Sequence, residues 1–273
     1  MRGGPAMLLA VLLALAGCAR APAPDVPARP MRIVSLDYCA DQYVLKLVDR
    51  SRILALSPDA ESSVSFMRGA ARGLPKVAAR AEDVLVLRPD LVVRSHGGGP
   101  GATAFFERAG VPVLQLGHAE DIAGIRRTLI DTARGLGEPA RGDRIAAEMD
   151  ARLAALRRQS SGKQALYMTS GGVTTGPGTL IDEMLHTAGF RNFQREPGWH
   201  PLPLERLARE RPDVVAAAFF GSDALIDRWS AARHPIARAQ LRGRPVVGLN
   251  GAWTACGGWF LLDAVEALAR ART

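Results

Sequence analysis

The sequence lacks the short motifs that mark many catalytic and nucleotide-binding centres. It contains neither G-x-S-x-G, which presents a serine nucleophile on a strand-to-helix turn, nor G-x-x-x-x-G-K-[ST], which binds phosphates. The glycine-rich stretch HGGGPG, residues 96–101, is therefore better interpreted as a binding loop than as an oxyanion or phosphate loop. We expect no enzymatic activity, and an exported α/β hydrolase is the less favoured alternative.

Metal-binding histidine pairs are also missing. The spacings H-x-x-x-H and H-E-x-x-H do not occur among the five histidines, which are His96, His118, His186, His200 and His234. This absence argues against a protein that binds a bare zinc or manganese ion. We predict no metal site built from protein ligands and no resident cofactor.

Long apolar runs are scarce. The run MLLAVLLALAG, residues 7–17, holds roughly ten apolar residues, about half of what spans a bilayer as a helix. Arg2 before it and small residues at its end predict a secretory signal peptide over residues 1–17. Residues 15–18, LAGC, resemble the lipobox of bacterial lipoproteins, so we expect Cys18 to carry a lipid that anchors the protein to a bacterial membrane in the periplasm. The alternatives are an ordinary signal peptide with an incidental cysteine and an uncleaved anchor.

The residues after Cys18 are rich in proline and alanine. Residues 18–30 have little to bury and predict a flexible, polyproline-like tether, with the folded part starting near Met31. The formal net charge of +8 becomes +7 when Arg2 is removed with the signal peptide, and the charges are scattered rather than clustered. The scattered charge and the predicted export both argue against a nucleic-acid partner. We expect contact with the membrane through the lipid anchor only.

Short apolar segments alternate with helix-length segments along the rest of the chain. They are RIVSL (32–36), ILALS (53–57), DLVV (90–93), PVLQL (112–116), QALYMT (164–169), DVVAAAF (213–219) and PVVGL (245–249). Such alternation predicts parallel α/β layers. Between the two groups, Pro139 and apolar residues at helical spacing predict one long helix. The predicted fold class is α/β: an N-terminal lobe (31–137) and a C-terminal lobe (161–273), each with a parallel sheet, joined by a single long rigid helix (138–160).

The two lobes contain the same short sequence motif, called the repeated phrase below. RPDLVV at 88–93 and RPDVV at 211–215 each follow a short helical pattern, and a glutamate stands seven residues before each proline, as Glu82 and Glu205. A junction between a helix and an inner strand explains the proline, the aspartate and the apolar residues. It does not explain why an exposed glutamate stands at the same offset in both copies.

These features resemble the periplasmic substrate-binding proteins of ABC importers for ferric siderophores, haem and cobalamin. The resemblance covers about residues 31–270, and its most specific elements are the repeated phrase and TTGPGTLIDEMLHTAGFRN, residues 174–192. It implies a monomeric, lipid-anchored protein that captures a metal chelate between two lobes and delivers it to a transmembrane permease dimer. In this family a surface glutamate on each lobe binds arginines of the permease, and the matching positions here are Glu82 and Glu205.

The same resemblance predicts that the ligand binds between the lobes, at loops after the carboxyl ends of the strands. These loops are DYCAD (37–41), SPDAE (57–61), SHGGGPG (95–101), YMTSGG (167–172), EPGWHP (196–201), FGSD (220–223) and NGAWTACGG (250–258). We expect Trp199 and Trp253 to stack on the ligand, with polar help from Tyr38, Arg94 and His96. Packing of either tryptophan within its loop is the alternative.

The sequence does not decide which metal chelate is the cargo. Lys76 stands where cobalamin binders carry a tryptophan, and Arg94, Ser95 and His96 replace an aromatic residue of those proteins. We therefore favour an iron-siderophore type of chelate, which can be acidic and attracted by Lys76, Arg94 or His96, over cobalamin or haem.

Two cysteines remain after Cys18 is assigned to lipid. Cys39 follows the first strand of one lobe and Cys256 follows the last strand of the other. Because an exported protein meets an oxidising compartment, we favour a disulfide between them over two separate thiols. Metal ligation by their thiolates is disfavoured, since no histidine pattern completes a usual ligand set.

Overall fold

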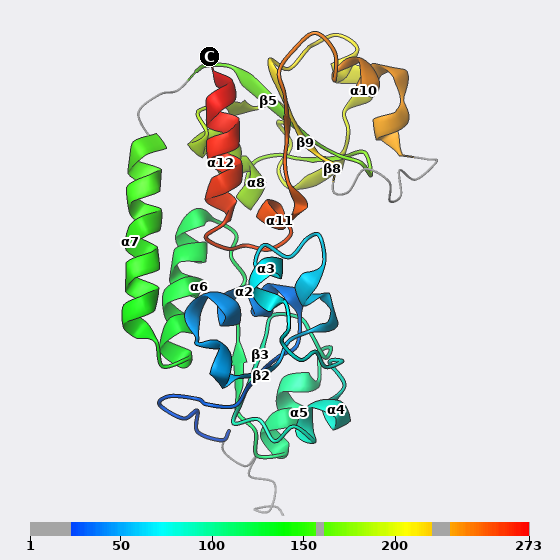
Figure 1. Ribbon diagram of the computed structural model, residues 1–273. Helices are drawn as coiled ribbons and strands as arrows, with labels where there is room; N and C mark the ends of the chain where they lie inside the picture. The colour runs from blue at the N-terminus through cyan, green and yellow to red at the C-terminus, as the bar shows by residue number, and fades with distance from the viewer. Residues whose placement is uncertain (1–22, 157–160, 220–229, 273) are drawn as a thin grey trace, which may run out of the picture.

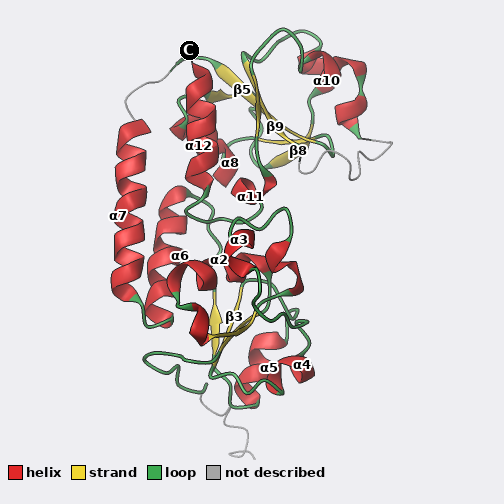
Figure 2. Cartoon of the chain, viewed as in Figure 1, coloured by secondary structure: helices red, strands yellow, loops and turns green. Residues whose placement is uncertain are grey.

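The computed structural model describes residues 23–156, 161–219 and 230–272 (Figure 1). The predicted signal peptide (1–17), the predicted lipidation site Cys18 and the predicted loop FGSD (220–223) lie outside the described residues. Helices and strands alternate along the chain, and Figure 2 shows the strands gathered into an upper and a lower group. No helix in the described ranges is long and apolar enough to cross a membrane.

The first sheet has four parallel strands in the order β2-β1-β3-β4. The strands are β1 (Ile33–Ser35), β2 (Ile53–Ala55), β3 (Leu91–Arg94) and β4 (Val113–Gln115). The helices are α2 (Tyr38–Leu47), α3 (Arg68–Ala71), α4 (Ala81–Leu85), α5 (Ala102–Arg108) and α6 (Ile122–Gly135), with 3-10 turns at Arg50–Arg52 and Pro58–Glu61. Ile33 on one face packs with α2 and α6, while Val34 on the other packs with α4 and α5. Both faces are therefore buried, as in parallel sheets generally.

The second sheet repeats this plan with the strand order β10-β9-β5-β7, again all parallel. The strands are β5 (Gln164–Thr169), β7 (Arg191–Asn192), β9 (Val214–Ala218) and β10 (Val246–Gly248), and a separate antiparallel pair joins β6 (Val173–Thr175) to β8 (Trp199–Pro201). The helices are α8 (Leu180–Thr187), α9 (Leu204–Leu207), α10 (Pro235–Ala239), α11 (Gly251–Thr254) and α12 (Leu261–Ala269), with 3-10 turns at Ala231–Arg233 and Arg270–Arg272. The predicted class, two α/β lobes with parallel sheets, is confirmed.

Helix α7 (Pro139–Leu156) lies between the two sheets in sequence, and in Figure 1 it runs alongside α6 and α12. Its 18 residues extend for about 27 Å at 1.5 Å per residue. It packs against α6 and against α12 near the C-terminus. Arg152 on α7 reinforces the second contact, because its guanidinium bonds Asp263 at 2.6 Å and Glu266 at 2.7 Å. The predicted helix covered residues 138–160, of which 157–160 lie outside the described residues.

The aspartate of the repeated phrase has the same structural role in both halves. The Asp90 carboxylate, just before β3, accepts hydrogen bonds from the backbone N–H groups of Met31 (2.8 Å) and Arg32 (2.9 Å), which precede the neighbouring strand β1. Asp213, just before β9, accepts one from the N–H of Gln164 (2.6 Å), the first residue of the neighbouring strand β5. Each phrase thus follows a helix, α4 or α9, and enters an inner strand, as predicted, while its aspartate holds the start of the adjacent strand.

Arg52 attaches the N-terminal segment to the first lobe. Its side chain is 1% exposed and donates to the carbonyls of Pro30 (2.6 Å) and Leu136 (2.6 Å). It also bonds the Glu138 carboxylate at 2.5 Å, at the start of α7. Pro30, which the sequence assigned to the flexible tether, is buried and fixed by this contact.

We predict that Arg52→Met lowers the free energy of unfolding by about 2 to 4 kcal/mol, because it removes three hydrogen bonds and leaves Glu138 with only an exposed partner, Arg29. Urea unfolding of the purified protein measures the change. Arg126→Met is the matched control: Arg126 and its partner Asp150 are both largely exposed, so its loss is expected to stay within about 1 kcal/mol. Equal stabilities of the two variants would contradict the role assigned to Arg52.

Candidate functional site

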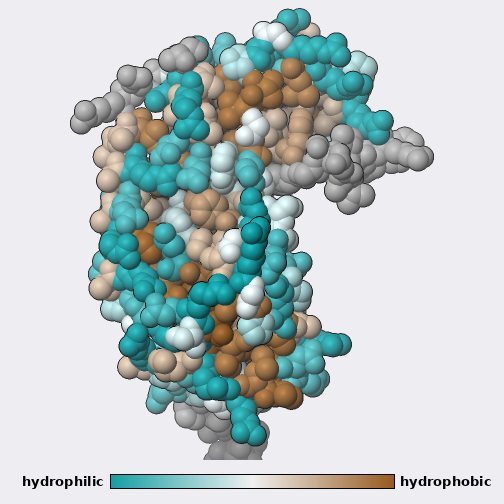
Figure 3. Space-filling model, in the orientation of Figure 1, coloured by the Kyte–Doolittle hydropathy of each residue, from teal (hydrophilic) through white to brown (hydrophobic). Residues whose placement is uncertain are grey.

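The carboxyl ends of the strands meet at a cleft of about 970 Å³ between the two halves. In the space-filling view the outline of the molecule is indented between its upper and lower parts (Figure 3). The first half lines the cleft with Tyr38, Cys39, Tyr43, Val64, Ser95, His96 and residues 115–120; the second half with Tyr167, Thr169, residues 178–181, Trp199 and residues 254–257. A concave site built from loops of two sheets is the expected place for a ligand.

The Asp37 carboxylate organises the first-half wall of the cleft. It accepts hydrogen bonds from the N–H of Ala40 (2.9 Å), which caps α2, and from the N–H groups of Ser95 (2.7 Å), His96 (3.1 Å) and Gly97 (2.9 Å). The Ser95 hydroxyl adds a fifth bond at 2.6 Å. Burial disfavours the charged form, but these bonds outweigh it and hold the pKa of Asp37 below its ordinary value. The loop after β3 is thus fixed to the start of α2 by an ionised carboxylate.

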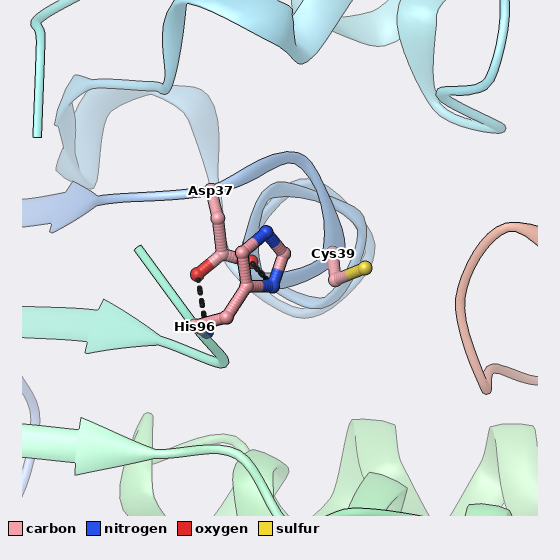
Figure 4. Close-up of side chains that lie close together, drawn as sticks. All are labelled: Asp37, Cys39 and His96. Atoms are coloured by element: carbon pink, nitrogen blue, oxygen red, sulfur yellow. Dashed lines mark hydrogen bonds and ion pairs between the residues drawn. The ribbon is translucent and has the colours of Figure 1, made fainter. Parts of the chain in front are cut away.

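His96 extends from this loop with its ring largely exposed, at 60%. Its Nδ1 lies 2.8 Å from the Ser95 hydroxyl and 3.7 Å from Asp37, and Figure 4 shows the ring beside that carboxylate. The Tyr38 ring meets it edge-on at a centroid distance of 5.7 Å. With Nδ1 engaged, Nε2 has no hydrogen bond to any described residue and is left for a ligand.

An aromatic pair forms the opposite wall. Tyr167 on β5 and Trp199 on β8 meet edge-on with centroids 6.1 Å apart. Trp199 is 57% exposed, whereas Tyr167 is buried, and burial raises the pKa of Tyr167 to about 12. The Tyr167 hydroxyl therefore stays neutral at physiological pH, and the exposed indole offers a flat apolar surface to the cleft.

Three of the five predicted ligand residues line the cleft, namely Tyr38, His96 and Trp199. Arg94 lies behind the wall: it is 6% exposed and its guanidinium donates to the Thr103 hydroxyl (3.1 Å) and the Gly99 carbonyl (2.9 Å). It holds the glycine-rich loop instead of facing the ligand space. Trp253 on α11 packs against the main buried cluster and does not line the cleft.

Two lining segments were not anticipated from the sequence. Residues 115–120 follow β4, and residues 178–181 form the start of α8. The first could have been found, because β4 was predicted and the loop after it occupies the same edge of the sheet as the others. The second follows β6, whose sequence VTT has a single apolar residue and so gives no recognisable strand pattern.

The cysteines are bonded to each other beside the cleft. The Cys39–Cys256 disulfide has a Cα–Cα distance of 5.6 Å and joins residues 217 positions apart, at the start of α2 and just after α11. The Tyr43 hydroxyl strengthens the same junction by donating to the Gly257 carbonyl at 2.8 Å. The rings of Tyr43 and Phe66 from the first half also contact Trp259 from the second. The halves are therefore joined through both covalent and packed contacts.

One group of metal-ligand side chains occurs in the described ranges: Asp37, Cys39 and His96 (Figure 4). Cys39 is in the disulfide and offers no thiolate, and the Asp37 carboxylate is occupied by its hydrogen bonds. His96 is then the one remaining donor of this group, and one donor is too few to hold a bare metal ion.

The two glutamates of the repeated phrase are exposed on the first turns of α4 and α9. Neither Glu82 nor Glu205 forms an ion pair within the described part of the chain, although each has charged neighbours that do. Arg80 pairs with Asp83, and Arg206 pairs with Glu210. Both glutamates are thus available to a cationic partner.

Comparison with known proteins agrees with this geometry. A family model described as "Periplasmic binding protein" matches residues 33–220. A periplasmic heme binding protein from Pseudomonas aeruginosa is 26% identical, with a TM-score of 0.66 and coverage of 89% of this chain and 92% of that one. The periplasmic heme-binding protein BhuT, in complex with two hemes, is 25% identical, with a TM-score of 0.67 and coverage of 89% and 99%.

The periplasmic vitamin B12 binding protein BtuF of Vibrio cholerae shares the fold at 20% identity, with a TM-score of 0.66 and coverage of 89% and 96%. No curated protein sequence matches the chain.

We predict that reduction of the Cys39–Cys256 bond lowers the free energy of unfolding by about 3 to 5 kcal/mol, because the bond closes a very long loop in the unfolded chain. Urea unfolding with and without a dithiol reductant measures the change. The Cys39→Ser/Cys256→Ser double variant serves as control and should unfold at one urea concentration in both conditions. A wild-type midpoint that does not respond to complete reduction would contradict the prediction.

Proposed function

The chain belongs to the periplasmic binding protein family, and from this premise we propose that it captures a metal chelate in the cleft and delivers it to the permease of an ABC importer. As a member of this family it is a solute-binding protein and not an enzyme. The exported α/β hydrolase alternative is thereby set aside. Delivery requires binding and release only, with no covalent step.

The observation that carries the proposal is the exposed Trp199 ring inside a concave site. The Trp199 ring is 57% exposed, and an exposed aromatic ring in a concave site provides a large, flat contact surface for a ligand. Trp199 faces a cleft whose other wall presents Tyr38 and His96. Flat aromatic surfaces suit a rigid chelate, and the free Nε2 of His96 can ligate the metal or accept a hydrogen bond from a polar group of the ligand.

We propose an iron-siderophore type of chelate as the cargo, with cobalamin or haem as alternatives. The heme and vitamin B12 binders among the similar structures show that the fold accommodates such rigid, metal-centred ligands. In our proposal Tyr38, His96 and Trp199 contact the cargo. Arg94 and Trp253 act from behind the wall, because hydrogen bonds and core packing already occupy them.

Glu82 and Glu205 are proposed to dock the permease dimer. The two glutamates occupy equivalent places in two similar halves, and both carboxylates are exposed and form no ion pair within the described ranges. A dimeric partner presents the same basic surface twice, so two equivalent acidic points fix the register of the complex.

The periplasmic location follows from the family, whereas attachment through a lipid on Cys18 is our proposal. The proposed mature protein starts at Cys18, has its tether up to about residue 30 and folds as an N-terminal lobe (31–137), a joining helix (138–160) and a C-terminal lobe (161–273). We propose that it works as a monomer.

Calorimetric titration with ferric siderophores, cobalamin and haem tests the proposal. We expect saturable binding of one chelate, and Trp199→Ala should weaken it about tenfold or more, because the ligand loses a flat contact surface. Trp253→Phe is the control, because Trp253 does not line the cleft, and it should change the dissociation constant by less than about twofold. The absence of binding across the panel, by protein shown to be folded from its circular dichroism, would overturn the chelate assignment.

Replacing both docking glutamates, as Glu82→Ala/Glu205→Ala, should abolish chelate uptake by cells and leave the affinity of the purified protein unchanged. The reason is that neither side chain lines the cleft. Glu148→Ala, an exposed glutamate on α7, provides the control and should retain uptake. Uptake that persists in the double variant would contradict the assignment of Glu82 and Glu205 to permease docking.

A further inference from the structure

The cleft contains almost no positive charge. Among the described residues that line it there is no lysine or arginine, and Glu120 is its one carboxylate. The other titratable side chains of the lining are tyrosines and the two histidines, His96 and His118. The chain as a whole carries +8, so this composition is a local property of the cleft.

Arg94 and Lys76, two of the three side chains that the sequence suggested for attracting an acidic chelate, are engaged elsewhere, whereas the third, His96, lines the cleft. Arg94 is buried behind the glycine-rich loop and donates to its carbonyls. Lys76 forms an ion pair with Glu61 at 2.5 Å and does not line the cleft. Neither Arg94 nor Lys76 is therefore placed to neutralise a negative group inside the cleft.

Helix N-termini do not replace the missing cations. The start of α2 enters the cleft at Tyr38 and Cys39, but the ionised Asp37 already caps it. The start of α8 enters at residues 178–181, and its first turn carries Asp182 and Glu183. Because carboxylates near a helix N-terminus offset its partial positive charge, neither helix is left as an anion site.

We infer that the cargo is a chelate without net negative charge, such as a neutral or cationic hydroxamate complex or a corrinoid with amide side chains. This inference rests on the proposed function and narrows its ligand class. A carboxylate or catecholate group brought into this cleft loses water and gains no lysine or arginine partner among the described lining residues, which disfavours its binding. Tricatecholate complexes, citrate-type complexes and haem with two free propionates are therefore selected against.

The remaining lining suits neutral polar groups. The Tyr167 hydroxyl makes no hydrogen bond within the described ranges, and the Tyr167 side chain lines the cleft. Gln115 uses its amide N–H groups on the carbonyls of Ser95 and Leu116, which leaves its oxygen as an acceptor. Hydroxyl and amide groups placed between aromatic rings recognise amides and hydroxamates by hydrogen bonds, with no change in net charge.

Matched ligand pairs test the inference with the full-length protein. The pairs are cyanocobalamin and a derivative with one amide hydrolysed to a carboxylate, haem dimethyl ester and haem, and a ferric trihydroxamate and a ferric tricatecholate. Within the pair that binds, we expect the neutral member to bind about tenfold tighter or more. Equal or tighter binding of the anionic member would overturn the inference and leave the proposed function standing. Failure of every pair to bind would overturn both.

A charge variant provides the second test. Glu120→Lys places a cation at the cleft and should improve the affinity of the anionic member several-fold while changing the neutral member little. Glu120→Gln keeps the size and removes the charge, so its effect should lie between the wild type and the lysine variant. An anionic ligand that responds to neither substitution would show that the charge of the cleft does not select the cargo.

Discussion

The buried carboxylate of Asp37 is the constraint on which the first wall of the cleft depends. One oxygen caps α2 and so sets the direction in which Tyr38 and Cys39 leave the backbone, while the other collects the N–H groups of the loop after β3. Gly97 lets that loop approach closely, because a Cβ at this position would collide with the Leu36 carbonyl. An ionised group held by five hydrogen bonds is expensive to displace, so the residues beside it keep their places whether or not a ligand is present.

The second constraint is the joint between the halves. The disulfide, the Tyr43 hydrogen bond and the rings around Trp259 lie on the cleft side of the molecule, while α7 packs along both halves with α6 and α12. A single buried cluster includes residues from both sheets, so the halves share part of their core. Such a cleft is preformed, and a preformed site recognises a rigid ligand with little ordering cost. A protein built in this way selects its cargo mainly by the shape and charge of the cleft.

Much of this architecture could be predicted from the sequence, because seven of the strands are apolar runs followed by polar or glycine-rich loops. The strands β6, β7 and β8 escaped prediction because none of them is an apolar run: their sequences are VTT, RN and WHP, and β8 contains Pro201. The cleft loops were located by the rule that parallel strands share a carboxyl edge, which correctly brought Tyr38, His96 and Trp199 together. The rule could not show that Arg94 turns into the wall, because the direction of a side chain depends on partners such as Thr103 and Gly99 that only the folded loop supplies.

The disulfide also bears on how the protein is made. Three cysteines allow three pairings, and two of those three involve Cys18. If the chain is exported unfolded and N-terminus first, Cys39 emerges long before Cys256, and during that interval the nearest thiol along the chain is Cys18. If Cys18 is converted to a thioether by its lipid, that thiol is removed and one pairing remains. Acylation of Cys18 would then both hold the protein at the membrane and prevent a non-native disulfide from forming with Cys18.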